Sequence, residues 1–113
     1  MKTSPASGLG AWILQRFTAV YLLFFFLFTL GYFAFHPPAS YEEWRAAVSG
    51  TAVVVASGVF AIALLAHAWV GLRDVILDYV KPLALRMAVL ALLAFCLAGM
   101  AAWMLRVLFA AGA

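Results

Sequence analysis

The sequence predicts an all-α membrane protein with three transmembrane helices. Of its 113 residues, 69% are hydrophobic and only 10% are charged, and the mean hydropathy is +1.13. Soluble domains have about a quarter of their residues charged. Three segments, residues 17–35, 46–72 and 87–105, carry no charge. Each reaches the roughly 20 apolar residues that a helix needs to cross a bilayer. Because lipid offers no partners to free backbone N–H and C=O groups, we expect these segments to be helical.

The first transmembrane helix is expected over residues 13–35. Its apolar run is longer than the roughly 7–15 residues of a signal-peptide core, and Arg16 lies directly against it, so we expect it to stay in the mature protein. Residues 1–8 are too short for a mitochondrial transit peptide, which favours a bacterial inner membrane. Pro37 and Pro38 should end this helix, because proline removes a donor and restricts the preceding residue.

The second helix has a recognisable start signal. Ser40 followed by Glu43 has the spacing of a capping box. One continuous helix is therefore expected from about Tyr41 to the region of Val75, with its transmembrane part at residues 46–74. That length exceeds the membrane, so its outer turns should reach into or past the headgroups.

The third transmembrane helix is expected over residues 84–107, with Pro82 suited to its first turn. No internal repeat or linker divides the chain, so residues 1–113 are expected to form a single membrane-anchor domain. Cys96 is the only cysteine and makes no internal disulfide, and we interpret it as a small packing residue.

The basic residues are distributed unequally between the two sides of the predicted bundle. By the positive-inside rule, the N-terminus lies in the cytoplasm and the C-terminus in the periplasm. The net charge is +3 and the isoelectric point is about 9.4, but the basic residues are scattered at helix ends, so the expected partner is the lipid bilayer and not nucleic acid. The cytoplasmic side would carry Lys2, Arg16, Arg73, Lys81 and Arg86, and the other side Arg45 and Arg106.

His67 is the first residue that suggests chemistry. It lies roughly 9 Å inside Arg73 along the helix, and ionisable groups within a membrane are costly and usually functional. Its neighbours four residues before and after, Ala63 and Gly71, are small. They leave a groove that a flat macrocycle or another helix could enter. The residues alone therefore leave two interpretations open, a haem ligand or a structural histidine bonded to a neighbouring helix.

A haem at His67 would need a ligand from outside the chain. His36 is the only other histidine, and it lies at the opposite end of the first predicted helix, most of a membrane thickness away. A bis-histidine haem would therefore take its second ligand from a partner subunit. His36 itself is interpreted as an interfacial loop residue.

Three further residues share the predicted cytoplasmic side with His67. Arg16 is expected either to extend towards lipid headgroups or to pair with a haem propionate or a quinone carbonyl. Asp78 and Tyr79 are expected in the inner connection. They would serve there as a cap and an interfacial anchor, or as a quinone site in which the phenol donates to a quinone oxygen and the carboxylate helps to resupply protons.

Two stretches resemble the D-type hydrophobic membrane anchor, the small cytochrome b subunit of bacterial succinate dehydrogenase (complex II). HAWVGLRDVILDYVKPLALRM, residues 67–87, resembles its second helix, loop and third-helix start. GLGAWILQRFTAVYL, residues 8–22, resembles its first-helix entry, where an arginine followed by a Thr-Ala pair recurs. Some family members carry polar residues, including a histidine, before that arginine, whereas residues 8–12 here are Gly-Leu-Gly-Ala-Trp.

The resemblance implies a role for each of the four residues. His67 would be an axial ligand to the iron of haem b, shared with a C-type cytochrome b anchor that supplies the second histidine. Arg16 would lie near a haem propionate and the quinone, Tyr79 would contact ubiquinone, and Asp78 would support its protonation.

The resemblance also implies a function for the whole chain. It would be the membrane anchor of a succinate:quinone oxidoreductase, with no catalytic residue of its own, docking an iron–sulfur subunit and a flavoprotein subunit. A fumarate reductase anchor and a purely structural anchor without haem are the alternatives. Transport has little support, because the chain shows neither repeats nor broken-helix signals.

Overall fold

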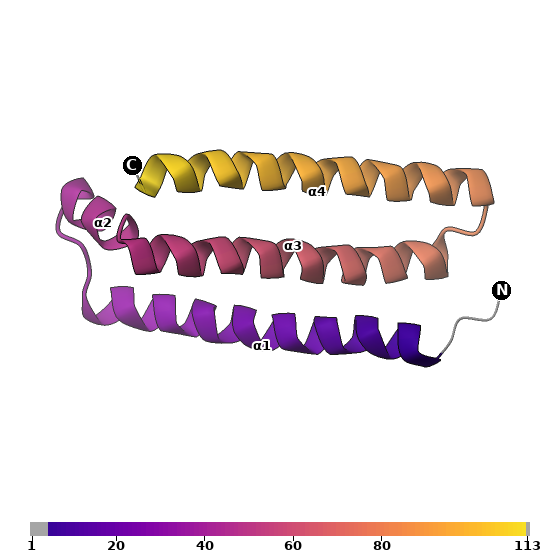
Figure 1. Ribbon diagram of the computed structural model, residues 1–113, viewed down its shortest axis with the longest axis horizontal. Coiled ribbons are helices and arrows are strands. Elements are labelled where there is room, and N and C mark those ends of the chain that lie inside the picture. Colours follow the sequence, from indigo (N-terminus) through magenta and orange to yellow (C-terminus); the bar gives the residue numbers. More distant parts are fainter. Residues whose placement is uncertain (1–4, 113) are drawn as a thin grey trace.

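The computed structural model describes residues 5–112, and within that range every regular element is a helix (Figure 1). Three of these helices are long and apolar enough to cross a membrane, which confirms the predicted all-helical class with three spans. Lys2, which contributed to the predicted charge asymmetry, lies outside the described residues. The helices are α1 (Pro5–Phe35), α2 (Tyr41–Val48), α3 (Thr51–Tyr79) and α4 (Leu83–Gly112).

The long helices form an antiparallel row with α3 in the middle (Figure 1). The starts of α1 and α4 lie with the end of α3, and we call this the N-terminal end of the bundle. The opposite end, which holds α2, is called the α2 end. Both α1 and α4 pack on α3, and the buried apolar residues of the described chain, Ala61, Ala63 and Val70, all belong to α3. Small side chains at these positions let the neighbouring helices approach closely.

The face of α1 that meets α3 follows a three- and four-residue spacing, as expected for a helix that packs along its length. Phe25 stacks on Phe60 with 4.5 Å between ring centroids. The Tyr21 hydroxyl donates to the Ala56 carbonyl of α3 at 2.8 Å. The buried and half-buried residues in this series are Ala11, Gln15, Thr18, Leu22, Phe25, Thr29 and Phe33.

The predicted start of the second helical segment is confirmed. Ser40 is the N-cap of α2, and its side chain accepts a hydrogen bond from the Glu43 N–H at 3.2 Å. The Glu43 carboxylate reaches back to accept from the Ala39 N–H at 2.8 Å. Ser40 and Glu43 therefore satisfy backbone donors on both sides of the helix start.

The prediction of one continuous helix from Tyr41 to the region of Val75 is wrong. The chain leaves helical geometry at Ser49 and Gly50, which separate α2 from α3. Gly50 adopts an extended conformation, with φ −61° and ψ 146°. Glycine is unfavourable within helices because of its backbone entropy, and serine competes for backbone hydrogen bonds. The adjacent pair of poor helix formers thus ends α2 and starts α3 anew.

The second correction concerns the connection between α3 and α4. Helix α3 continues to Tyr79, so Asp78 and Tyr79 form its last turn and not part of a loop. The connection is only residues 80–82. Pro82 directly precedes α4, as predicted for the first turn, and its carbonyl accepts from the Arg86 N–H at 2.9 Å.

Arg86, in the first turns of α4, holds the end of α3. Its Nε donates to the Val80 carbonyl at 3.0 Å and its Nη2 donates to the Leu77 carbonyl at 3.2 Å. The last carbonyls of a helix lack intrahelical partners and carry the negative end of its dipole. A guanidinium at this place both satisfies the carbonyls and complements their charge.

Replacing Tyr21 with Phe should destabilise the α1–α3 contact by about 0.6 kcal/mol, the average measured for interhelical hydrogen bonds within membranes. The Ala56 carbonyl belongs to helix α3 and is not left unpaired when the hydroxyl is removed, so the loss of stability is small. The measurement is a denaturation titration with SDS in mixed micelles. Tyr32→Phe, at an exposed ring of the same helix, is the matched control, and equal midpoints for the two variants would contradict the expectation.

Replacing Arg86 with Met should lower the free energy of unfolding by about 1–2 kcal/mol, because two hydrogen bonds from a charged donor are lost at a partly exposed site. Hydrogen exchange of backbone amides near residues 77–82 should accelerate. Arg86→Lys keeps the charge but not the forked donors, so an intermediate result is expected. Arg106→Met serves as the control at the other end of α4, and exchange unchanged by Arg86→Met would refute the role of this residue.

Candidate functional site

The contact between α1 and α3 contains the His67 side chain close to the middle of both helices. A hydrogen bond of 3.0 Å joins the Oγ1 of Thr18 to the Nδ1 of His67. The Thr18 hydroxyl also donates to the Leu14 carbonyl at 2.7 Å and lies 3.1 Å from the Gln15 carbonyl. Thr18 is only 8% exposed and His67 is half-buried. One edge of the imidazole is therefore tied to the backbone of α1 through the Thr18 hydroxyl.

One helical turn closer to the N-terminal end, Gln15 packs against Gly71. A Cβ atom at position 71 would lie 3.4 Å from the Gln15 Nε2, at the close edge of ordinary van der Waals contact. The Gln15 amide therefore lies close against α3 at Gly71. The Oε1 of Gln15 is buried and has no hydrogen-bond partner among the described residues. Buried polar atoms normally have partners, so this oxygen marks a position that another group can satisfy.

Arg16 points away from this contact. Its guanidinium carbon lies 5.4 Å from the centroid of the Trp12 ring, a cation–π arrangement within the same helix. The side chain is exposed and is not in the series of α1 residues that faces α3. Arg16 therefore lies at about the same depth as His67 but presents its charge to the outside of this chain.

Asp78 and Tyr79 lie in the last turn of α3 and are also exposed, with Tyr79 80% accessible. The nearby Arg73 and Asp74 form an ion pair at 3.1 Å on the surface. Among residues 8–112, no hydrogen bond joins the side chains of Arg16, Asp78 or Tyr79 to one another or to His67. The structure thus places Asp78 and Tyr79 at the N-terminal end of the bundle and His67 roughly 18 Å away along α3, at about the depth of Arg16, and it packs only His67 into a helix contact.

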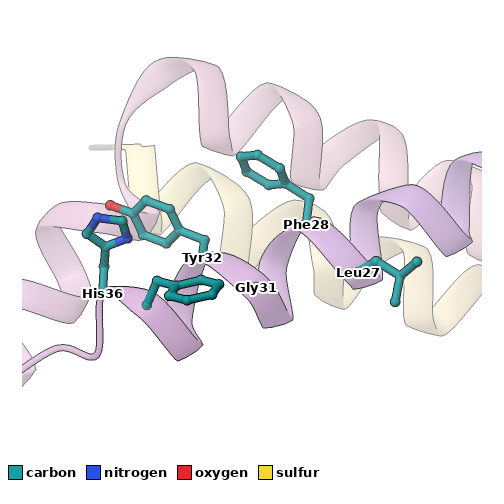
Figure 2. A pocket seen from close by; sticks show the side chains of 6 residues that line it. Leu27, Phe28, Gly31, Tyr32 and His36 are labelled. Carbon is teal, nitrogen blue, oxygen red and sulfur yellow. The ribbon is translucent and has the colours of Figure 1, made fainter.

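The second histidine lies at the α2 end. His36 follows α1 and stacks on Tyr32 with 5.0 Å between ring centroids. Both rings line a shallow hollow of about 270 Å³, together with Leu27, Phe28, Gly31 and Phe35. Figure 2 shows the His36 and Tyr32 rings close together. The predicted separation of the two histidines is confirmed, since Thr18, the partner of His67, precedes His36 by 18 residues, or roughly 27 Å along α1.

A larger cavity of about 570 Å³ lies between α1, α2 and α3 at the α2 end. Its lining is mainly aromatic and aliphatic, with hydroxyls from Thr29, Ser57 and Tyr32. Among the described residues, no carboxylate, imidazole or cationic side chain lines it. The cavity is therefore mainly apolar, with hydroxyls as its polar side-chain groups.

Two residues of the His67 contact, Thr18 and Gln15, had no assigned role in the sequence interpretation. Thr18 entered only as part of the Thr-Ala pair in the family resemblance. A usable signal existed: both are polar residues in a transmembrane helix, three positions apart, and so lie on the same face.

The chemistry open to His67 follows from its two ring nitrogens. Nδ1 is engaged by Thr18, whereas Nε2 has no hydrogen-bond partner among the described residues. Neutral imidazole binds metals through one nitrogen, and the other usually makes a hydrogen bond that fixes the ring. Within residues 5–112, no three His, Cys, Asp or Glu side chains gather closely enough to hold a metal ion. His67 thus fits a single-ligand role for a metal whose other ligands come from elsewhere.

Comparison with known proteins covers nearly the whole chain. A family described as the succinate dehydrogenase/fumarate reductase transmembrane subunit matches residues 2–105. The succinate dehydrogenase hydrophobic membrane anchor subunit of Coxiella burnetii (strain RSA 493 / Nine Mile phase I) is 30% identical over 104 residues, which are 92% of this chain and 90% of that protein. The three apolar helices agree with a multi-pass membrane protein. The chain belongs to the family of succinate dehydrogenase and fumarate reductase membrane anchor subunits.

Proposed function

We propose that the chain is the D-type anchor of a succinate:quinone oxidoreductase, in which it holds haem b together with a C-type cytochrome b anchor, helps to form the ubiquinone-reduction site, and docks the iron–sulfur and flavoprotein subunits. The observation that carries the proposal is the hydrogen bond between Thr18 and His67. It fixes a membrane-embedded imidazole in the helix whose last residue is the exposed Tyr79.

His67 fits the role of an axial haem ligand. Its Nδ1 is engaged by Thr18, which leaves Nε2 to bind iron. Haem, when bound, supplies a one-electron redox centre. Since His36 lies at the α2 end, the second axial nitrogen would come from the partner anchor.

Tyr79 and Asp78 would serve the quinone. The Tyr79 phenol is exposed and can donate a hydrogen bond to a quinone oxygen, holding it while electrons arrive. The Asp78 carboxylate beside it is exposed to solvent and can return a proton to the site from water. Arg16, exposed at the same end, supplies several N–H donors for a haem propionate or a quinone carbonyl.

The charge distribution of the described residues supports a cytoplasmic N-terminal end and a periplasmic C-terminus in a bacterial inner membrane. The soluble subunits would then dock on the N-terminal end, because electrons from succinate must reach a quinone bound beside Tyr79. The N-terminal end carries Arg16, Arg73, Lys81 and Arg86, and the α2 end carries Arg45 and Arg106.

Replacing His67 with Ala should greatly reduce the haem content of the complex co-purified with its partner anchor, because an axial ligand is lost. The measurement is the dithionite-reduced minus oxidised spectrum, read at the b-type α band and normalised to protein. His36→Ala is the matched control and should keep the band. A wild-type complex without any b-type α band would contradict haem binding. An unchanged band in His67→Ala would contradict ligation by His67.

Replacing Tyr79 with Phe should lower succinate:quinone reductase turnover by at least about tenfold, because a positioned proton donor contributes on the order of 10²–10⁴-fold. Succinate oxidation with an artificial dye acceptor, which bypasses the quinone site, should stay close to wild type. Tyr41→Phe, an exposed tyrosine at the α2 end, is the control. An equal loss in both assays would indicate failed assembly and remove Tyr79 from the proposed role.

A further inference from the structure

We propose that Thr18 is a positioning residue that fixes the tautomer of His67: the Thr18 hydroxyl donates to the Leu14 carbonyl and accepts from the imidazole Nδ1–H, so that Nε2 alone carries the lone pair available to a metal. This inference rests on the proposed haem ligation by His67. It adds the reason why one particular nitrogen of the ring faces the iron, and it assigns that role to a residue of α1.

The direction of the hydrogen bonds follows from the groups around the hydroxyl. Thr18 has one O–H proton, and two backbone carbonyls lie near its oxygen, Leu14 at 2.7 Å and Gln15 at 3.1 Å. Carbonyls only accept. The 2.7 Å distance matches an ordinary O–H···O bond, and the 3.0 Å distance to the His67 Nδ1 matches an ordinary N–H···O bond. The proton of the hydroxyl therefore goes to Leu14, and its oxygen accepts from the ring.

Burial makes this arrangement selective. Thr18 is 8% exposed, and the surrounding helices are apolar enough to span a membrane, so water cannot easily replace the threonine. If the proton sat on Nε2 instead, the Thr18 hydroxyl would have to turn from Leu14 towards Nδ1. That tautomer would also place a bound proton on the nitrogen that must be bare to bind iron.

The hydrogen bond also tunes the ligand. An imidazole that donates from Nδ1 is a stronger electron donor through Nε2, since the acceptor draws the proton and raises the basicity of the ring. Because the acceptor oxygen is itself held by the backbone of α1, the orientation of the ring is tied to the packing of α1 on α3. Thr18 thus acts through His67 and touches neither iron nor quinone.

The test uses the complex purified with its partner anchor and soluble subunits. Thr18→Val keeps the shape of threonine without the hydroxyl, and Thr18→Ser keeps the hydroxyl. The Val variant should bind haem roughly 10–100-fold less tightly, as for other ligand-orienting residues. In the haem that remains, the midpoint potential should rise because the weaker donor stabilises the oxidised iron less. The Ser variant should restore both values towards wild type. Thr29→Val, in the same helix face at the α2 end, should change neither.

Two outcomes overturn the inference. A Thr18→Val complex with wild-type haem content and midpoint potential would show that the ring needs no acceptor. A Ser variant as defective as the Val variant would assign the effect to the threonine methyl and hence to packing.

Assembly is checked in every variant by dye-linked succinate oxidation and by subunit content. A residue that acts through His67 cannot cost more than the loss of His67 itself. If Thr18→Val fails to assemble while His67→Ala assembles, the role of Thr18 is structural and the inference falls. If His67→Ala keeps its full haem content, the proposed haem ligation fails instead, so the two failures are distinguishable.

Discussion

The antiparallel contact of α1 with α3 is the constraint on which the rest of the structure depends. Within apolar surroundings a polar side chain must find its partner inside the protein. The partners here lie across this one contact: Thr18 with His67, and Tyr21 with the Ala56 carbonyl. Shifting α1 by one residue would rotate these groups by about 100° and separate them. The register of the helix pair is therefore set by polar contacts at two depths and by the Phe25–Phe60 stack near its middle.

Much of the fold was predictable because helices in a membrane are dictated by length and hydropathy. The charge-free segments predicted all three spans, and Ser40 with Glu43 predicted where α2 begins. The break at Ser49 and Gly50 was missed, because two poor helix formers only end a helix when the context allows it. The end of α3 was placed too early for a similar reason: charged residues near Asp78 resemble a loop, although an exposed helix end tolerates them equally well.

The site was predictable as a set of residues but not as an arrangement. His67 stood out because an imidazole in an apolar helix is rare, and topology placed Arg16, Asp78 and Tyr79 at the same end. Gln15 and Thr18 mark a polar face of α1, but the sequence does not show which residue of that face meets His67. Only the packed structure gives Thr18 its partner, turns Arg16 outwards and brings Gln15 against Gly71.

Arg86 affects the order in which the helix contacts can form during synthesis. The donors that close the end of α3 come from α4, a later part of the polypeptide. The α1–α3 contact, by contrast, is complete once residues up to Tyr79 have been synthesised. During biogenesis the contact between Thr18 and His67 can therefore form first. The Leu77 and Val80 carbonyls depend on water or lipid headgroups until Arg86 has been synthesised. The turn that carries Tyr79 thus gains its final support only after the α1–α3 contact can be complete.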